Sequence, residues 1–398
     1  MNSIAAGSPT GGASEASRTG TLGDVPTPDV IRMVVSSGAG VSDLIFSPGR
    51  PPQVERHGVL TAVAVPGLEL LRGDDTARIA RDLIGSNEQA QASLREQGAC
   101  DLSYSVPECG RFRVNVFRQR GTHAIVMRVI ASRIPTLGEL NLPPRLSEIA
   151  DLKNGIVLVT GPTGSGKSST LAAIIDMINE TRADHILTVE DPIEFLHNHK
   201  KSTVHQRELH SDTPTFAAAL RAALRQAPKV ILVGELRDRE TIEIAITAAE
   251  TGHLVFSTLH TIDASKTVER IIGVFDAGDQ QGIRTRLASS FRCFIAQRLL
   301  PRKGGGRMAI LEILKSTMRT REYVERGESE GRSLVDAMRD GELEGMQHFD
   351  GELEKLVRAG ETSKKSALLY ASNAGNLAVA LADVTDADEA SVITQGFN

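Results

Sequence analysis

Hydrophobic residues in the second half of the chain fall into short runs separated by segments of helical composition. Strands that alternate with helices usually form a mainly parallel sheet with helices on its faces. We therefore predict an α/β fold for this half, with further helices over Ile283–Leu299 and Ser333–Ala359 that would make the end of the chain helical. The runs that predict buried strands are GIVLVTG (155–161), HILTVED (185–191), KVILVGE (229–235) and HLVFSTLH (253–260).

The first half of the chain mixes short strand and helix signals. SDLIFSPGRPP (42–52) predicts a strand followed by a turn, and Asp75–Leu94 has the composition of a helix. Residues 110–117 alternate strictly between apolar and polar, which predicts a half-buried strand, with a neighbouring strand over His123–Ile130. The apolar face of the first of these strands carries Phe112, Val114 and Val116, and its other face carries Arg111, Arg113 and Asn115.

Prolines mark the boundary between two predicted domains. The segment Ser132–Pro144 is interrupted by prolines and lacks a long period, so it predicts a linker. Residues 1–24 are small and polar, which predicts a disordered tail. The expected organisation is therefore a tail (1–24), a first domain (25–134), a linker (135–145), a second domain (146–372) and a weakly patterned, mobile tail (373–398).

Composition narrows the classes of function. The formal net charge is −5 and only 4% of the residues are aromatic, with no Trp, which argues against a nucleic-acid-binding protein. The 3 cysteines form no CxxC pair, so a metal site of the paired-cysteine type is not supported. No apolar run approaches the roughly 18 residues needed to cross a bilayer. We therefore expect a cytoplasmic protein that meets the membrane only through partners.

A phosphate-binding loop is the strongest functional signal. GPTGSGKSS (161–169) follows an apolar strand and precedes a helix, which is the context that the G-x-x-x-x-G-K-[ST] pattern requires. The glycines let backbone N–H groups turn toward phosphates, Lys167 offers them a charge, and Ser168 offers a hydroxyl to Mg²⁺. The predicted cofactors are ATP and Mg²⁺, and the predicted binding residues are Gly161, Thr163, Gly164, Ser165, Gly166, Lys167, Ser168 and Ser169.

Acidic residues at two strand ends are candidates for catalysis. In VILVGELRDRE (230–240) a glycine stands where a Walker B strand usually carries its magnesium-binding aspartate, so Glu235 is the best candidate to orient the attacking water. In VEDPIEF (189–195), Glu190 is a candidate for the magnesium shell or the water. Asp191 and Glu194 are alternatively the N-cap and first-turn residues of a helix. A strand-end carboxylate that is merely solvated is the plain alternative for both glutamates.

Two histidines flank the predicted strand 253–260. His260 lies at its end, where it is a candidate to sense the γ-phosphate or to bridge subunits, and His253 is a candidate for similar work. A lone histidine near a strand end is more often structural, but the neighbouring motifs favour a functional role for His260. Thr241–Thr251 precedes the strand as a predicted helix that Gly252 ends.

These four motifs, in this order and spacing, resemble the secretion-ATPase superfamily. Its defining set is a phosphate loop, an aspartate box, a Walker B strand that ends in Gly-Glu, and a histidine box. Within it, the chain is most similar to the twitching-motility ATPases of type IV pili, and to the PilU branch more than the PilT branch. The segments that carry this likeness are SDLIFSPGRPP, GRFRVNVFRQRG, FLHNHKKS, VGELRDRET and ALLYASNAGNL.

The resemblance implies a PAS-like N-terminal α+β domain, a RecA-like C-terminal P-loop ATPase domain and a homohexameric ring. It implies a catalytic set of Lys167, Glu190, Glu235 and His260, with Ser168 and Glu190 at the metal. In such a ring the N-terminal domain supplies arginines to the nucleotide, where a guanidinium neutralises the charge that develops on the γ-phosphate. A solvated basic strand face is the alternative for these positions, which are Arg111, Arg113, Arg120 and Arg128.

Two departures from the family pattern refine the expected function. The paired CxxC motifs and extra N-terminal region of extension ATPases are missing, which favours pilus retraction. The AIRNLIRE segment of PilT-type motors is replaced by RTREYVER (319–326), which favours an auxiliary that works beside a PilT-type ATPase. The implied partners are this second ATPase and an inner-membrane platform protein of the pilus, with no nucleic acid.

Other functions remain open on the sequence alone. An ATPase of a type IV secretion system uses the same core, and it predicts genes for an export apparatus nearby rather than pilins. A nucleotide-gated scaffold with poor turnover is a different class, although the intact set Lys167, Glu190 and Glu235 argues against it. A DNA translocase is disfavoured by the acidic balance and the scarcity of aromatic residues.

Overall fold

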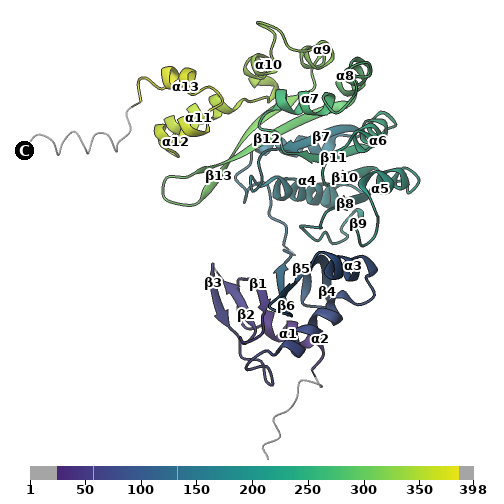
Figure 1. Cartoon of the computed structure of the whole chain (residues 1–398). Coiled ribbons are helices and arrows are strands. Elements are labelled where there is room, and N and C mark those ends of the chain that lie inside the picture. Colours follow the sequence, from purple (N-terminus) through teal and green to yellow (C-terminus); the bar gives the residue numbers. More distant parts are fainter. Residues whose placement is uncertain (1–24, 57, 132, 385–398) are drawn as a thin grey trace, which may run out of the picture. The chain divides into compact units, whose positions relative to one another are not determined.

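The computed structural model describes residues 25–56, 58–131 and 133–384 (Figure 1). By its internal contacts the chain divides into two compact units, Met1–Val129 and Ile130–Asn398. The predicted disordered tail (1–24) and residues 385–398 of the predicted mobile tail lie outside the described residues. The division falls ahead of residues 135–145, whose assignment as a linker stays a prediction.

Over its described residues, the first unit forms a six-stranded antiparallel sheet packed against helices. The strand order is β3-β2-β1-β6-β5-β4. The predicted alternation in β5 is confirmed, because Phe112, Val114 and Val116 are fully buried whereas Arg113 is exposed. The elements are α1 (Thr27–Val35), β1 (Val41–Phe46), β2 (Gln53–Arg56), β3 (Val59–Ala62), α2 (Gly73–Ile84), α3 (Glu88–Glu96), β4 (Ala99–Val106), β5 (Gly110–Gln119) and β6 (Thr122–Val129).

The single helix predicted over Asp75–Leu94 is wrong in one respect, because the structure has two helices there. Gly85 ends α2 with a φ of 52°, a left-handed conformation that a helix cannot continue. The side chain of Asn87 then caps α3 by accepting a hydrogen bond from the Ala90 N–H at 2.9 Å. A glycine and a capping asparagine together therefore outweigh the helix-forming residues between them.

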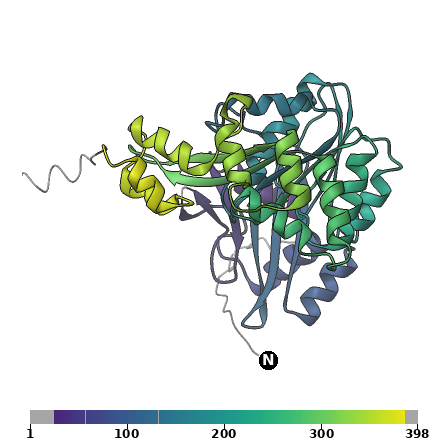
Figure 2. The same ribbon diagram turned by 90° about the horizontal axis from the view of Figure 1, so that it is seen from above.

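The second unit is built on a seven-stranded sheet in the order β13-β12-β7-β11-β10-β8-β9, counted over the described residues (Figures 1 and 2). Every neighbouring pair from β12 to β9 is parallel, and β13 pairs antiparallel with β12 as a hairpin. The four predicted strands are β7, β8, β10 and β11, so the predicted α/β fold is confirmed. The bounds are β7 (Gly155–Thr160), β8 (His185–Glu190), β9 (Thr203–Glu208), β10 (Val230–Val233), β11 (Leu254–Leu259), β12 (Phe291–Pro301) and β13 (Arg307–Lys315).

Helices cover both faces of this sheet because alternate residues of each strand point in opposite directions. In β7, Val157 and Val159 pack with helix α4 (Lys167–Thr181) and the 3₁₀ segment Pro144–Asp151. Ile156 and Leu158 pack into the core of the opposite face. The helices that contribute to that core are α5 (Phe216–Ala223), α6 (Arg239–Glu250), α7 (Ala264–Ile272), α8 (Gln280–Ser290), α9 (Met318–Arg326) and α10 (Leu334–Asp340).

The helix predicted over Ile283–Leu299 is wrong for its second half. Helix α8 ends at Ser290, and the apolar run that follows is strand β12, which pairs with β7 on one side and β13 on the other. A short apolar run buried on both faces has no period that distinguishes strand from helix, so tertiary pairing decides.

The helix predicted over Ser333–Ala359 is also wrong as one element. It divides into α10, a 3₁₀ turn (Glu342–Glu344) and α11 (Phe349–Arg358). Gly345, with a φ of 86°, lies between the turn and α11.

The end of the described chain forms a small helical cluster on the β12–β13 hairpin. The cluster is yellow in Figures 1 and 2. It contains α11, α12 (Lys364–Tyr370) and α13 (Ala374–Ala380). Leu353, Leu377 and Leu381 are buried in its own apolar core together with Leu300 and Ile310 of the hairpin. Residues 374–380, part of the tail predicted from residue 373, form helix α13, and the mobility of that tail stays a prediction. No helix in the described part of the chain is long and apolar enough to cross a membrane.

Replacing Leu353 by Ala is expected to lower the free energy of unfolding by about 2–5 kcal/mol, because it leaves a cavity in a core where this side chain has no solvent exposure. Leu343→Ala is the matched control, since Leu343 is fully exposed and its loss should change stability by less than about 0.5 kcal/mol. Urea titrations of the full chain compare the two, and equal midpoints would contradict the packing of the cluster.

Candidate functional site

The loop between β7 and α4 has the backbone that phosphate binding requires. Gly164 and Gly166 have φ values of 77° and 89°, a region that strains any residue with a side chain. At Gly161, an added Cβ would lie 2.3 Å from the carbonyl oxygen of Gln297. The motif glycines therefore meet two separate demands, a left-handed backbone and a close approach to strand β12.

Gln297, on β12, holds this loop in place and was missed by the sequence analysis. Its side chain is buried, and its Nε2 donates to the Ser165 carbonyl oxygen at 2.7 Å. Its Oε1 accepts a hydrogen bond from Thr170 Oγ1 at 2.8 Å, on the first turns of α4. The only sequence signal is one polar residue inside an apolar run that was predicted to be helical. Gln297 thus ties the loop and the following helix to the sheet.

Lys167 is the buried cation of the loop. The residue is 8% exposed, and its Nζ donates to the carbonyl oxygens of Gly161 at 2.9 Å and Pro162 at 3.1 Å. Burial lowers the pKa of Lys167, and the negative charges of Glu235 and Glu194 oppose that shift. An ammonium group held among loop carbonyls at the start of a helix is placed to receive phosphate oxygens.

A cavity of about 780 Å³ opens in front of the loop. It lies at the edge of the sheet where the carboxyl ends of parallel strands meet, the usual ligand position in open α/β sheets. Two of the predicted loop residues do not line it: Gly161 is packed against β12, and Ser165 is buried with its Oγ making no hydrogen bond to the described residues. The predicted residues that do line it are Thr163, Gly164, Gly166, Lys167, Ser168, Ser169, Glu190, Glu235 and His260.

Glu235 and His260 meet at this edge. Glu235 follows β10, and its Oε2 accepts a hydrogen bond from Arg237 Nε at 2.6 Å. The same oxygen lies 3.7 Å from His260 Nε2, beyond the end of the adjacent parallel strand β11. The Glu235 side chain is 17% exposed and the His260 side chain 47% exposed. A carboxylate that lines the cavity in this way could accept a hydrogen bond from a water bound there, as a group that orients an attacking water must.

Glu190 ends β8 on the other side of β10. Its Oε1 accepts hydrogen bonds from Thr188 Oγ1 at 2.6 Å and Gln206 Nε2 at 3.1 Å. Burial raises the pKa of Glu190, and these two hydrogen bonds partly oppose the shift. An added Cβ at Gly234 would lie 3.4 Å from Glu190 Cα, so the glycine that replaces the usual Walker B aspartate packs directly against this strand end.

Asp191 and Glu194 also line the cavity. The alternative that they begin a helix is wrong, because the described segment 191–202 contains no helix. Both side chains belong to residues that are exposed. They add negative charge to the rim opposite Lys167.

The donor set of the cavity fits magnesium. Ser168 and Glu190 line the cavity, and their side chains carry oxygen atoms, the kind of ligand that Mg²⁺ prefers. No three His, Cys, Asp or Glu side chains in the described residues form a complete metal site. Magnesium usually keeps several waters and phosphate oxygens, so one or two protein oxygens beside a nucleotide are the appropriate number.

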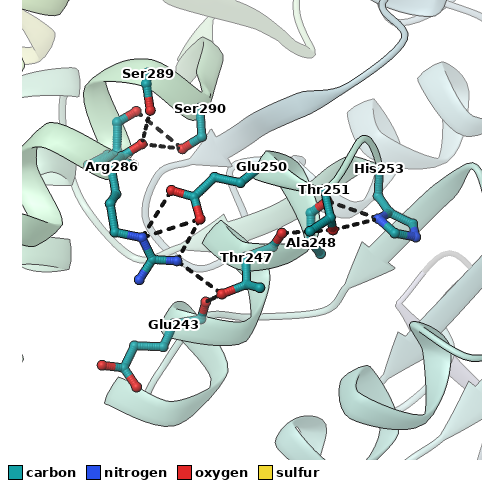
Figure 3. A network of polar contacts seen from close by, with 10 residues as sticks. Glu243, Thr247, Ala248, Glu250, Thr251, His253, Arg286, Ser289 and Ser290 are labelled. Atoms are coloured by element: carbon teal, nitrogen blue, oxygen red, sulfur yellow. Dashed lines mark hydrogen bonds and ion pairs between the residues drawn. The ribbon is translucent and has the colours of Figure 1, made fainter.

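The structure does not bring His253 to this cavity. It precedes β11, whereas His260 follows it, so the length of the strand, about 20 Å at about 3.3 Å per residue, separates them. His253 Nδ1 lies 2.9 Å from the Ala248 carbonyl oxygen and 3.3 Å from Thr251 Oγ1, at the end of α6 (Figure 3). The same end of α6 is tied to α8 by Arg286, which donates to both carboxylate oxygens of Glu250. His253 therefore has a structural position.

The four predicted arginines lie in the first unit. Arg111 and Arg113 are on β5 and Arg128 is opposite Arg113 on β6, while Arg120 lies in the turn between the strands with a φ of 46°. Arg128 Nε donates to Asp43 Oδ1 at 2.9 Å. Their approach to a nucleotide stays a prediction.

Comparisons with known proteins agree with this geometry. The family model described as "Type II/IV secretion system protein" matches residues 86–304. The chain is 43% identical to the type IV pilus retraction ATPase PilT of Pseudomonas aeruginosa, over 84% of this chain and 95% of PilT. It is 38% identical to the type IV pilus ATPase PilU of the same organism, over 93% of this chain and 95% of PilU.

A solved structure is similar over almost the whole fold. The crystal structure of the pilus retraction motor PilT with bound ADP has a TM-score of 0.77 and 39% identity, and the match covers 88% of this chain and 98% of that one. The described loop, cavity and strand-end carboxylates are those of a nucleotide-hydrolysing enzyme. The chain therefore belongs to the family of type II/IV secretion system proteins, and it is a P-loop ATPase of that family.

Proposed function

We propose that the chain is the subunit of an ATP-hydrolysing motor that powers retraction of type IV pili. The observation that carries this proposal is the convergence of Lys167, Glu190, Glu235 and His260 on one cavity. It occurs in a chain that is similar to pilus ATPases over more than four-fifths of its length. We further propose a PilU-like auxiliary role beside a PilT-type motor. The alignment with PilU covers more of this chain, 93% against 84%, which supports this role, while the identity to PilT is higher, 43% against 38%.

Each residue of the site has a distinct part in the proposed reaction. Lys167 exchanges its carbonyl partners Gly161 and Pro162 for the β- and γ-phosphates of ATP. Ser168 and Glu190 would hold Mg²⁺, which would neutralise charge on the phosphates. Glu235 orients the water for in-line attack, and the hydrogen bond from Arg237 fixes the direction of that carboxylate.

His260 connects the water-orienting group to the rest of the fold. Its ring lies beside Glu235, and it is half exposed toward the cavity. We propose that it responds to the γ-phosphate, because a phosphate oxygen would offer this imidazole a stronger partner than a carboxylate 3.7 Å away.

The proposed working assembly is a homohexamer that acts in the cytoplasm on an inner-membrane platform protein of the pilus. Arg111, Arg113, Arg120 and Arg128 would supply positive charge to the nucleotide in that ring. The pairing of Arg113 with Arg128 across β5 and β6 supports this proposal, since it gathers two guanidinium groups on one face of a sheet. The Asp43 carboxylate at 2.9 Å already orients one of them.

Replacing Glu235 by Gln is expected to lower kcat for ATP hydrolysis by about 10²-fold or more, because the amide cannot accept the proton of the attacking water. The affinity for ATP should stay close to that of the wild type, since Glu235 does not hold the phosphates. Steady-state phosphate release and titration with a fluorescent ATP analogue measure the two quantities.

The matched control is Glu240→Gln. Glu240 is an exposed carboxylate on α6 that pairs with Arg221 and does not line the cavity. Its replacement should leave kcat within about twofold of the wild type. An unchanged kcat in Glu235→Gln would rule out the assigned role.

In a piliated bacterium that depends on this protein, the Glu235→Gln substitution is expected to reduce the frequency or the force of pilus retraction, observed on fluorescently labelled pili. Pilus extension should persist, because retraction alone depends on this motor. Unaltered retraction together with a defect in protein export would contradict the pilus proposal and would favour a secretion ATPase.

A further inference from the structure

Two charged side chains that the proposed reaction does not use, Glu312 and Arg298, form hydrogen bonds with the backbone after His260. The segment that follows His260 runs from Thr261 to Asp263, and Asp263 caps α7 by accepting a hydrogen bond from the Lys266 N–H at 2.7 Å. Behind it, Glu312 of β13 accepts a hydrogen bond from the Ala264 N–H at 2.7 Å. Arg298 of β12 donates from Nη2 to the Ile262 carbonyl oxygen at 3.2 Å.

Glu312 is a buried acidic residue whose side chain accepts the hydrogen bond from the Ala264 N–H. It is 2% exposed, and burial raises its pKa to about 7. Among the described charges, Arg298 opposes this shift and Asp263 and Asp350 add to it. A carboxyl group in this position fixes the start of α7, which begins four residues after His260.

Arg298 makes a second set of contacts, with the helical cluster at the end of the chain. Its Nη1 donates to the Tyr370 carbonyl oxygen at 2.5 Å and its Nη2 to Ser372 Oγ at 3.2 Å. Its guanidinium carbon lies 3.8 Å from the centre of the Phe349 ring, a close cation–π contact. One planar group therefore contacts the end of α12, the start of α11 and the segment after His260 at once.

Hydrogen bonds also connect the helices of the cluster to one another at this point. Asp350, next to Phe349 on α11, accepts hydrogen bonds from the N–H groups of Ser372 and Asn373 at 2.7 and 2.8 Å. These bonds fix the connection between α12 and α13 to α11. Residues 370–373, which Arg298 contacts, are therefore joined to α11 as well as to α12 and α13.

Threonine hydroxyls connect the start of the segment to Thr160, the residue before the phosphate loop. Thr261 Oγ1 lies 2.6 Å from Thr267 Oγ1, which donates to the Asp263 carbonyl oxygen at 2.8 Å. Thr267 Oγ1 also lies 3.5 Å from Thr160 Oγ1, at the end of β7 immediately before the loop. The residues after His260 are thus linked through Thr267 to Thr160, the residue before the phosphate loop, and they also contact Arg298.

We propose that Arg298 is a positioning residue for His260 and couples the state of the nucleotide site to helices α11–α13. When His260 moves toward a γ-phosphate, the Ile262 carbonyl moves with it, and the guanidinium transmits that displacement to Tyr370 and Phe349. This inference rests on the proposed hydrolysis of ATP. It identifies the helical cluster as the part of the second unit that reports nucleotide state.

The matched control is Arg302, the residue that follows the end of β12. Arg302 Nε donates to Glu361 Oε2 at 2.9 Å, so it also ties the hairpin to the helical cluster. Its guanidinium makes no described contact with residues 260–264. A general weakening of the cluster should therefore appear in Arg302→Met, whereas a loss of coupling should not.

The experiment is hydrogen–deuterium exchange of the full chain with ADP and with a slowly hydrolysed ATP analogue, alongside steady-state kinetics. In the wild type, the two nucleotides should give different protection of the α12–α13 amides. In Arg298→Met this difference should disappear and kcat should fall by about tenfold or more, because a misplaced group costs rate, while the Kd for nucleotide changes less than about twofold. Arg302→Met should keep both the difference and the kcat.

Arg298→Lys provides a second variant if the methionine variant is unstable. Its ammonium is a point charge without the planar fork that directs Nη1 to the Tyr370 carbonyl and Nη2 to the Ile262 carbonyl, so it should also lose the difference. A nucleotide-dependent difference that survives in both Arg298 variants would overturn the coupling, and so would an equal loss in Arg302→Met. The exchange readout needs no turnover, so its failure is distinguishable from a failure of the proposed hydrolysis in the wild type.

Discussion

The parallel pairing of β12, β7, β11, β10 and β8 is the constraint on which the rest of the second unit depends. Because these strands run in one direction, the phosphate loop after β7, Glu190 after β8, Glu235 after β10 and His260 after β11 emerge at the same edge. Lys167 and His260 are 93 residues apart in the sequence, yet the pairing of these strands places both at the same cavity. The buried Lys167 ammonium can then face carboxylates across that cavity without being paired to any of them.

The sequence predicted the parts of this site that depend on local pattern. The apolar runs of β7, β8, β10 and β11 and the glycines of the loop have short-range causes, burial on both faces and a left-handed backbone, so they were identified. Gln297 was missed because its role arises only from pairing β12 beside β7, and β12 itself was mistaken for the continuation of a helix. His253 was given a role similar to that of His260 because the two residues are close in the sequence. They lie at opposite ends of β11, and therefore at opposite edges of the sheet.

Charged side chains of the second unit lie in two places. Lys167 and the strand-end carboxylates line the cavity. Arg298 bonds the Ile262 carbonyl and Glu312 accepts from the Ala264 N–H, so both contact the backbone that follows His260. Although the net charge of the chain is −5, the phosphate loop brings a lysine and the N-terminus of α4 together, which favours a bound polyanion locally.

Steady-state phosphate release from ATP by the purified full chain, with and without Mg²⁺ and with and without a PilT-type partner, distinguishes a motor from a scaffold. For a motor, we expect saturable release that requires Mg²⁺ and that rises with the partner. Tight ATP binding without phosphate release under any of these conditions would contradict the motor proposal, and would indicate a nucleotide-gated scaffold instead of a motor.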